Sequence, residues 1–219
     1  MKSFDNEWEQ IHSTSEWGAY PSEHVIRFVA RRYYKLKRDE IKILDFGCGA
    51  GNHVWYLARE GFDTYGFDGS ASAIKKAVNK LDKEHLQAHL QVSDALEINY
   101  EKDFFDAVID SACIYSNKVA DIKMMYHNIF EILKTGGQML TICFGKETDG
   151  YTTGEEIENG TYVNIQSGNL AGRGTAHFFD KKEIIEIIEN AGFRDISVDE
   201  VIYTDNQAKV HQYVISAVK

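Results

Sequence analysis

From residue 41 onward, short apolar runs alternate with amphipathic stretches, and this alternation limits the folds open to the chain. It predicts helices over 52–60, 72–85 and 120–133, where apolar residues recur at three- and four-residue spacing. It predicts strands over 41–46, 64–67, 90–92, 104–110 and 138–144. Strands joined by helices lie parallel, so an open α/β sheet is expected.

The pattern changes after residue 144. Residues 145–175 contain seven glycines and read as an insertion, which in such folds usually covers a site. A helix over 180–190, capped by Asp180, precedes strands over 196–203 and 210–218. The connecting loop at 204–208 is short, so these two strands are expected to be antiparallel and to form a hairpin at one edge of the sheet.

Length and charge exclude several classes of protein. The 219 residues suit a single domain. The net charge of −10 argues against a nucleic-acid partner, since phosphate binding needs a basic face. No apolar run approaches the ~20 residues of a membrane span, and no signal peptide is visible, so no membrane partner and a cytoplasmic location are expected. Three cysteines without a C-x-x-C pair predict neither disulfides nor a metal site.

A glycine-rich turn follows the first strand. Asp45 ends that strand, and the turn runs through Gly47, Cys48, Gly49 and Gly51 before a helix. Glycines allow a sharp turn and a close approach to a ligand, and the helix offers free N–H groups. The spacing does not match the dinucleotide fingerprint, and no Gly-Lys-Ser/Thr follows as in a phosphate-binding loop.

Four further segments resemble class I S-adenosylmethionine-dependent methyltransferases, whose first motif is an acidic residue followed by G-x-G-x-G. They are Asp68-Gly69-Ser70 after the second strand, Ser93-Asp94-Ala95 after the third, 104–111 ending in Asp110-Ser111, and 133–137, where Thr135 replaces the usual proline. The resemblance covers residues 40 to 145. It implies a Rossmann-like, doubly wound, seven-stranded, mostly parallel sheet with an antiparallel C-terminal hairpin strand.

The resemblance also implies S-adenosylmethionine as cofactor. Asp68 would accept hydrogen bonds from both ribose hydroxyls, and the turn at Asp94 would read the adenine. An acidic strand edge suits a sulfonium better than a pyrophosphate. As alternatives, Asp45 could fix the turn, and Asp68, Asp94 and Asp110 could cap local structure. The expected cofactor contacts are Tyr20, Asp45, Gly47, Cys48, Gly49, Gly51, Asp68, Gly69, Ser70, Ser93, Asp94, Ala95, Asp110 and Ser111.

In the family, the N-terminal helices and the segment after the fifth strand form the acceptor pocket. Here these are a helical cap over 1–39 and the insertion over 145–178. The aromatic residues Trp8, Trp17, Tyr20 and Tyr115 could enclose the sulfonium methyl or simply pack. Tyr115 and His177 are the candidate catalytic residues, His177 as a general base or, alternatively, as a structural histidine. Tyr151, Tyr162 and Arg173 could line a polar acceptor site together with His177.

The hypothesis that results is a small-molecule methyltransferase working by in-line displacement, as a monomer or homodimer. Residues 109–113 lack the Asn/Asp-Pro-Pro-Tyr signature of enzymes that methylate base or glutamine amino groups. Three alternatives stay open: a non-catalytic protein that binds S-adenosylmethionine or S-adenosylhomocysteine, an aminopropyl transferase and, as the least favoured, a dehydrogenase.

Overall fold

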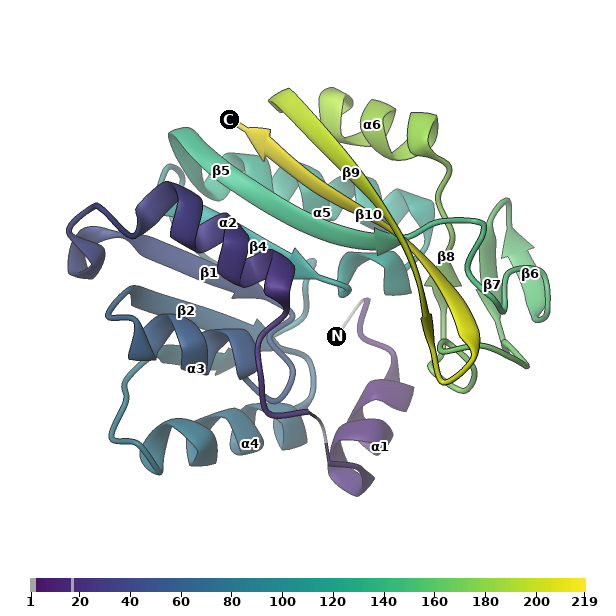
Figure 1. The fold of residues 1–219 in the computed structure, drawn as a ribbon, viewed down its shortest axis with the longest axis horizontal. Helices are drawn as coiled ribbons and strands as arrows, with labels where there is room; N and C mark the ends of the chain where they lie inside the picture. The colour runs from purple at the N-terminus through teal and green to yellow at the C-terminus, as the bar shows by residue number, and fades with distance from the viewer. Residues whose placement is uncertain (1–2, 17) are drawn as a thin grey trace.

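A twisted seven-stranded sheet forms the centre of the molecule (Figure 1). The structure is a computed structural model that describes residues 3–16 and 18–219. The strand order is β3-β2-β1-β4-β5-β10-β9. The strands are β1 (Lys42–Phe46), β2 (Asp63–Asp68), β3 (His89–Val92), β4 (Phe105–Ser111), β5 (Leu133–Phe144), β9 (Arg194–Asp205) and β10 (Ala208–Val218).

One strand runs against the other six. Neighbours from β3 to β5 pair in parallel, whereas β10 pairs antiparallel with both β5 and β9. The hairpin expected at one edge is therefore confirmed, with β9 outermost. The predicted Rossmann-like fold class, with its antiparallel C-terminal hairpin strand, is confirmed as well.

Helices cover both faces of the sheet (Figure 1). On one face lie α2 (Glu23–Tyr33), α3 (Asn52–Arg59) and α4 (Ala71–Asp82), where Val25 and Leu57 pack against Ile109. On the other lie α5 (Val119–Ile132) and α6 (Lys181–Asn190), where Ile129 and Ile184 belong to the larger core with Val108. Two 3₁₀ turns, η1 (Arg38–Glu40) and η2 (Ile114–Ser116), complete the connections.

Local sequence signals set most helix ends. The Asp180 side chain accepts a hydrogen bond from the Glu183 N–H, as the predicted N-cap of α6. Helix α5 ends at Ile132, one residue before its predicted end, but the strand predicted to start at residue 138 starts five residues earlier. The strand β5 begins at once at Leu133, because Leu133 already pairs with Phe105 of β4. Pairing with β4 thus extends the strand beyond the apolar run from which it was predicted.

The segment after β5 is not an open loop. It contains a small antiparallel sheet of β6 (Glu155–Glu158), β7 (Thr161–Val163) and β8 (Ala176–His177). Tyr162 and Phe178 pack at its base in the larger core. Near the N-terminus, α1 (Asn6–Thr14) lies apart from the layers, beside the start of α4 (Figure 1).

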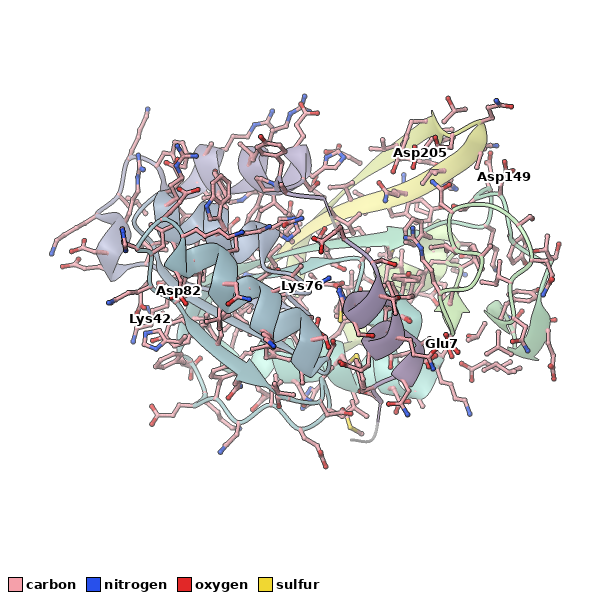
Figure 2. All side chains as sticks on the ribbon, turned by 90° about the horizontal axis from the view of Figure 1, so that it is seen from below. Glu7, Lys42, Lys76, Asp82, Asp149 and Asp205 are labelled. Carbon is pink, nitrogen blue, oxygen red and sulfur yellow. The ribbon has the colours of Figure 1, made fainter. Side chains whose placement is uncertain are left out.

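Charged side chains cover the outside of the molecule (Figure 2). The labelled acids Asp82, Asp149 and Asp205 come from α4, the segment after β5 and the end of β9, so the acidic excess is spread over distant elements. Within the described residues, no helix is both long enough and apolar enough to span a lipid bilayer.

Candidate functional site

A cavity lies at the carboxyl ends of the central strands, where ligands of open α/β sheets bind. Its walls come from the turn after β1, the ends of β2 and β4, the loop after β3, α1 and the insertion. Nine of the sixteen expected cofactor contacts and catalytic candidates line it: Gly47, Cys48, Gly49, Asp68, Gly69, Ser93, Ala95, Ser111 and Tyr115. Trp8 and Arg173, which were candidates for the acceptor pocket, line it as well. The described residues Tyr20, Asp45, Gly51, Ser70, Asp94, Asp110 and His177 do not.

The glycine turn is folded tightly against its neighbours. The Cys48 N–H donates to the Phe67 carbonyl at 2.8 Å, which ties the turn to the end of β2. Gly51 caps α3 with a φ of 78°, and a Cβ placed there would lie 2.6 Å from the Cβ of Ala77 on α4. Burial raises the pKa of the Cys48 thiol, so it lines the cavity as a neutral group.

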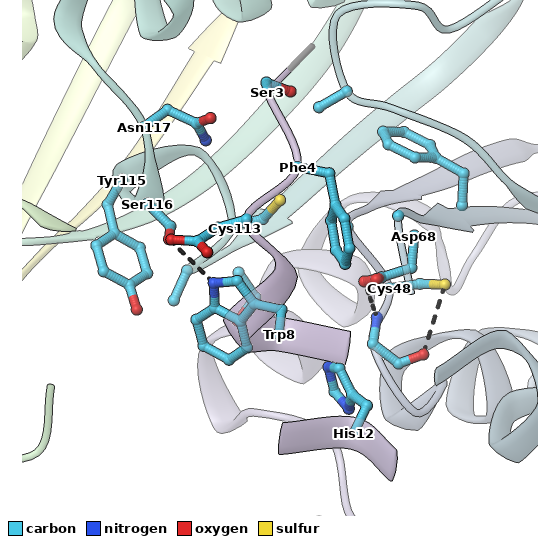
Figure 3. A pocket seen from close by; sticks show the side chains of 18 of the residues that line it. Ser3, Phe4, Trp8, His12, Cys48, Asp68, Cys113, Tyr115, Ser116 and Asn117 are labelled. Atoms are coloured by element: carbon cyan, nitrogen blue, oxygen red, sulfur yellow. Dashed lines mark hydrogen bonds between the residues drawn. The ribbon is translucent and has the colours of Figure 1, made fainter. Parts of the chain in front are cut away.

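Asp68 presents its carboxylate to the cavity. Its Oδ2 accepts a hydrogen bond from the Gly49 N–H at 2.9 Å (Figure 3). Its Oδ1 accepts one from the Ser70 N–H at 2.8 Å. Burial raises the pKa of Asp68, while these two hydrogen bonds and nearby His12 oppose the rise. Each oxygen keeps lone-pair capacity for a further donor from a ligand.

Asp45 lies behind the turn with only 1% of its surface exposed. Its Oδ1 is 3.4 Å from Nδ1 of His53, which lines the cavity. Its Oδ2 is buried and has no hydrogen-bond partner within the described part of the chain. A buried carboxylate oxygen without a partner is costly, so this position favours a positively charged or hydrogen-bonding ligand nearby.

Asp94 is engaged by the N-terminal segment. Its Oδ2 accepts hydrogen bonds from the N–H groups of Ser3 and Phe4, at 2.8 and 3.1 Å. Its Oδ1 accepts from the Ser3 hydroxyl and from the Leu96 N–H. The hydrogen bonds to Ser3, Leu96 and Phe4 lower the pKa of Asp94 against the opposing effect of burial. In this structure Asp94 holds residues 3 and 4 at the cavity wall, and its contact with adenine stays a prediction.

Asp110 shapes the cavity from behind. Its Oδ1 accepts hydrogen bonds from the N–H groups of Cys113 and Ile114, and its Oδ2 accepts one from the Thr141 hydroxyl. The carboxyl is fully buried, and burial raises its pKa to about 6. The side chain thus fixes the loop after β4, whose Cys113 and Tyr115 line the cavity.

Helix α1 lies across the cavity (Figure 3). The Trp8 indole N–H donates to the Ser116 hydroxyl at 3.0 Å, and that hydroxyl donates to the Thr175 carbonyl. One turn further on, the buried His12 ring lies against Gly49. Burial lowers the pKa of His12 against the opposing charge of Asp68, which favours the neutral imidazole.

The wall formed by the loop after β4 and the insertion combines aromatic rings with a cation. The Tyr115 and Phe144 rings meet edge to face at 4.8 Å between centroids. Burial raises the pKa of Tyr115, and the nearby charge of Arg173 partly opposes this. Arg173 is the only lysine or arginine among the described residues that line the cavity. This wall therefore offers a neutral phenol, the amide of Asn117 and a guanidinium.

Two candidates lie elsewhere. Tyr20 is 80% exposed and away from the cavity wall. His177 is fully buried in β8, with its Nδ1 2.7 Å from the Thr161 hydroxyl and its Nε2 3.2 Å from a Glu183 carboxylate oxygen. Its position joins the small sheet to α6, which supports the structural alternative for this histidine. Trp17 lies outside the described residues.

Sequence reasoning did not single out several residues that line the cavity, among them Phe4, His12, Cys113, Ser116, Asn117 and Phe144. Cys113, Ser116 and Asn117 follow the carboxyl end of β4, and Phe144 is the last residue of β5, so strand position alone could have nominated these four. No local pattern marks Phe4 or His12, because they reach the cavity through contacts with β2, the β1 turn and Asp94 that are distant in sequence.

Comparison with known proteins gives a consistent result. Residues 37–192 match the family model of the methyltransferase domain. Phosphoethanolamine N-methyltransferase 2 of Caenorhabditis elegans is 30% identical over 161 residues, covering 72% of this chain. The matched part is 33% of that relative, so the chain spans about a third of its length.

Solved structures share the fold. An S-adenosylmethionine-dependent methyltransferase from Methanosarcina mazei superposes with a TM-score of 0.73 at 23% identity, covering 91% of this chain and 98% of that chain. Phosphoethanolamine N-methyltransferase 2 of Haemonchus contortus, in complex with phosphomonomethylethanolamine and S-adenosylhomocysteine, gives 0.70 at 19% identity, covering 97% of this chain and 56% of that chain.

Proposed function

The chain belongs to the family of methyltransferase domains, and from this membership we propose that it transfers a methyl group from S-adenosylmethionine to a small-molecule acceptor. The observation that carries the proposal is the Asp68 carboxylate, which lines the cavity with one backbone N–H on each oxygen. Two parallel acceptor oxygens suit a vicinal diol such as a ribose.

The residues present fit this cofactor. Asp68 would hold the ribose hydroxyls, and Ser93 and Ala95 line the part of the cavity next to the end of β3. The buried Asp45 carboxylate lies behind the glycine turn, so it would favour the ammonium of the methionine portion through its negative charge rather than by direct contact. The acidic residues of this edge do not oppose a cofactor whose sulfur is positively charged.

S-adenosylmethionine supplies a methyl group on a positively charged sulfur, which is already an electrophile. The chain's own contribution is then placement of the acceptor in line with that methyl group. Tyr115, whose pKa is raised by burial, would act as a neutral hydrogen-bonding phenol that positions the acceptor rather than as a base. Helix α1, anchored by Trp8 to Ser116, would exclude water from the cavity.

For the acceptor, we assign the wall around Arg173. The guanidinium there favours a molecule that carries a phosphate or carboxylate group. Relatives named phosphoethanolamine N-methyltransferase carry a phosphate-bearing compound in their name, which is consistent with this assignment.

Thermal unfolding of the protein saturated with S-adenosylhomocysteine tests the acceptor class. Small amines with a phosphate or carboxylate group, including phosphoethanolamine, are compared with ethanolamine. We expect only anionic compounds to raise the melting temperature, and Arg173→Met to abolish the rise. A rise with ethanolamine alone, which carries no anionic group, would contradict the assignment, and so would the absence of any response to the phosphate- and carboxylate-bearing compounds.

A crystal structure with S-adenosylhomocysteine tests the reaction itself. We expect the ribose on Asp68 and the sulfur facing open space beside Tyr115 and Arg173. If the ligand binds with its sulfur sealed by protein, the chain is the non-catalytic binding protein instead.

A further inference from the structure

A second group of potential ligands lies outside the cavity. Glu147 follows β5, Glu200 lies on β9 and His211 lies on β10. One ligand atom from each of the three side chains can be chosen so that all three atoms lie within 4.8 Å of one another. None of the three residues lines the proposed active-site cavity. The group therefore needs an explanation of its own.

His211 is held rigidly in this group. Its backbone N–H and carbonyl both bond to the Thr148 hydroxyl, at 3.1 and 2.9 Å, and its carbonyl also accepts from the Gly145 N–H. The imidazole fills the space above Gly145, where a Cβ would lie 2.3 Å from Nδ1. With 2% of its surface exposed, the ring has little freedom to turn.

Among the described residues, the His211 ring has an ion-pair contact but no hydrogen bond. Nε2 lies 2.9 Å from Oε1 of Glu200, yet within the described part of the chain neither ring nitrogen has a partner with hydrogen-bond geometry. A buried ring nitrogen without a hydrogen bond is costly, and a cation placed between Nε2 and the two carboxylates would satisfy this nitrogen through its lone pair.

We propose that Glu147, Glu200 and His211 bind a divalent cation of the zinc type. One imidazole and two carboxylates form a mixed nitrogen and oxygen set, which favours zinc over magnesium or calcium. Zinc bonds of about 2.0–2.2 Å bring tetrahedral ligand atoms to about 3.4 Å from one another. The two glutamates are exposed and can rotate to close the set around the fixed histidine.

Lys209 competes with the cation. Its Nζ lies 2.6 Å from Oε2 of Glu147. The ammonium thus supplies positive charge to the same carboxylate, and the cation would take its place. Bound metal would join the segment after β5 to the β9–β10 hairpin. Phe144, immediately before that segment, lines the cavity.

Zinc and cobalt titrations of the purified full chain test the site. We expect one equivalent of Zn²⁺ that competes with a chelator, visible absorption bands from Co²⁺, and a higher melting temperature with Zn²⁺. Glu200→Gln is expected to weaken binding at least about tenfold, since even outer partners of metal ligands contribute that much. Glu155→Gln, an exposed acid on β6, is the matched control and should bind like the wild type.

Lys209→Met distinguishes competition between Lys209 and the metal from nonspecific damage to the site. Removing an exposed ammonium from the site should tighten Zn²⁺ binding roughly two- to fivefold. A variant that merely damaged the site would bind Zn²⁺ more weakly. Circular dichroism confirms that each variant folds. The proposal is overturned if the wild type shows no stoichiometric Zn²⁺ and no Co²⁺ bands, or if Glu200→Gln binds as tightly as the wild type. Neither result would affect S-adenosylhomocysteine binding at the other site.

Discussion

At the scale of single residues, four aspartates at strand ends have different surroundings. Asp68 faces the cavity, Asp45 lies behind the glycine turn, and Asp94 and Asp110 bind backbone N–H groups of adjoining segments. The sequence predicted that acids would gather at this edge. It could not separate their roles, because a loop cap and a ligand contact use the same residue type at the same spacing.

Asp110→Asn tests the role of the buried carboxyl through pH. The pKa of about 6 lies above that of an unfolded aspartate, so the folded state binds the proton more tightly. The contribution of Asp110 to wild-type stability is therefore present at low pH and lost as the pH rises through 6. Asparagine keeps an oxygen for Cys113 and Ile114 and an amide for Thr141.

We expect Asp110→Asn to gain about 2–3 kcal/mol relative to the wild type between pH 4 and pH 7. Urea unfolding at several pH values measures the difference, with the exposed Asp199→Asn as control. If the difference in unfolding free energy between Asp110→Asn and the wild type does not change with pH, the pKa of Asp110 is not raised by burial.

At the scale of elements, the turn between β1 and α3 was predicted because its signals are local in sequence. The placement of α1 was not, since it depends on contacts between distant residues. Trp8 bonds to Ser116, and Glu9 accepts hydrogen bonds from the hydroxyls of Ser70 and Ser72. No periodicity within residues 6–14 encodes those partners.

Gly51 and Gly136 have nearly equal φ angles, so their alanine variants distinguish the cost of backbone strain from the cost of a packing clash. Gly51 has φ 78° and Gly136 has φ 80°, but a Cβ meets Ala77 at 2.6 Å in the first case and open space in the second. We expect Gly136→Ala to cost about 1 kcal/mol and Gly51→Ala about 3 kcal/mol. Chemical denaturation gives both values. Equal costs would show that α3 and α4 do not pack as closely as described.

Trp8→Ala tests α1 as the cover of the cavity. Losing the hydrogen bond to Ser116 and the partly buried ring should speed S-adenosylhomocysteine release about tenfold, measured by stopped-flow displacement. Gln10→Ala, exposed on the same helix, should leave the release rate unchanged. Equal rates in wild type and Trp8→Ala would mean that α1 does not gate release.

At the scale of the whole molecule, the alternating pattern predicted the parallel core and the C-terminal hairpin. It did not predict the small sheet of β6 to β8, because those strands are 4, 3 and 2 residues long and glycine-rich sequence separates them. The sheet brings its central strand ends to one edge, and the insertion adds Arg173 there. The global topology thus places residues as far apart in the sequence as Ser3 and Arg173 around one cavity.

Isothermal titration calorimetry with S-adenosylhomocysteine tests the central claim most directly. We expect one site on the wild type and at least tenfold weaker binding by Asp68→Asn, because hydrogen bonds to a charged group contribute about 1.5–3 kcal/mol. Asp63→Asn, at the other end of β2, is the matched control and should bind like the wild type. No binding by the folded wild type, or unchanged binding by Asp68→Asn, would contradict the account.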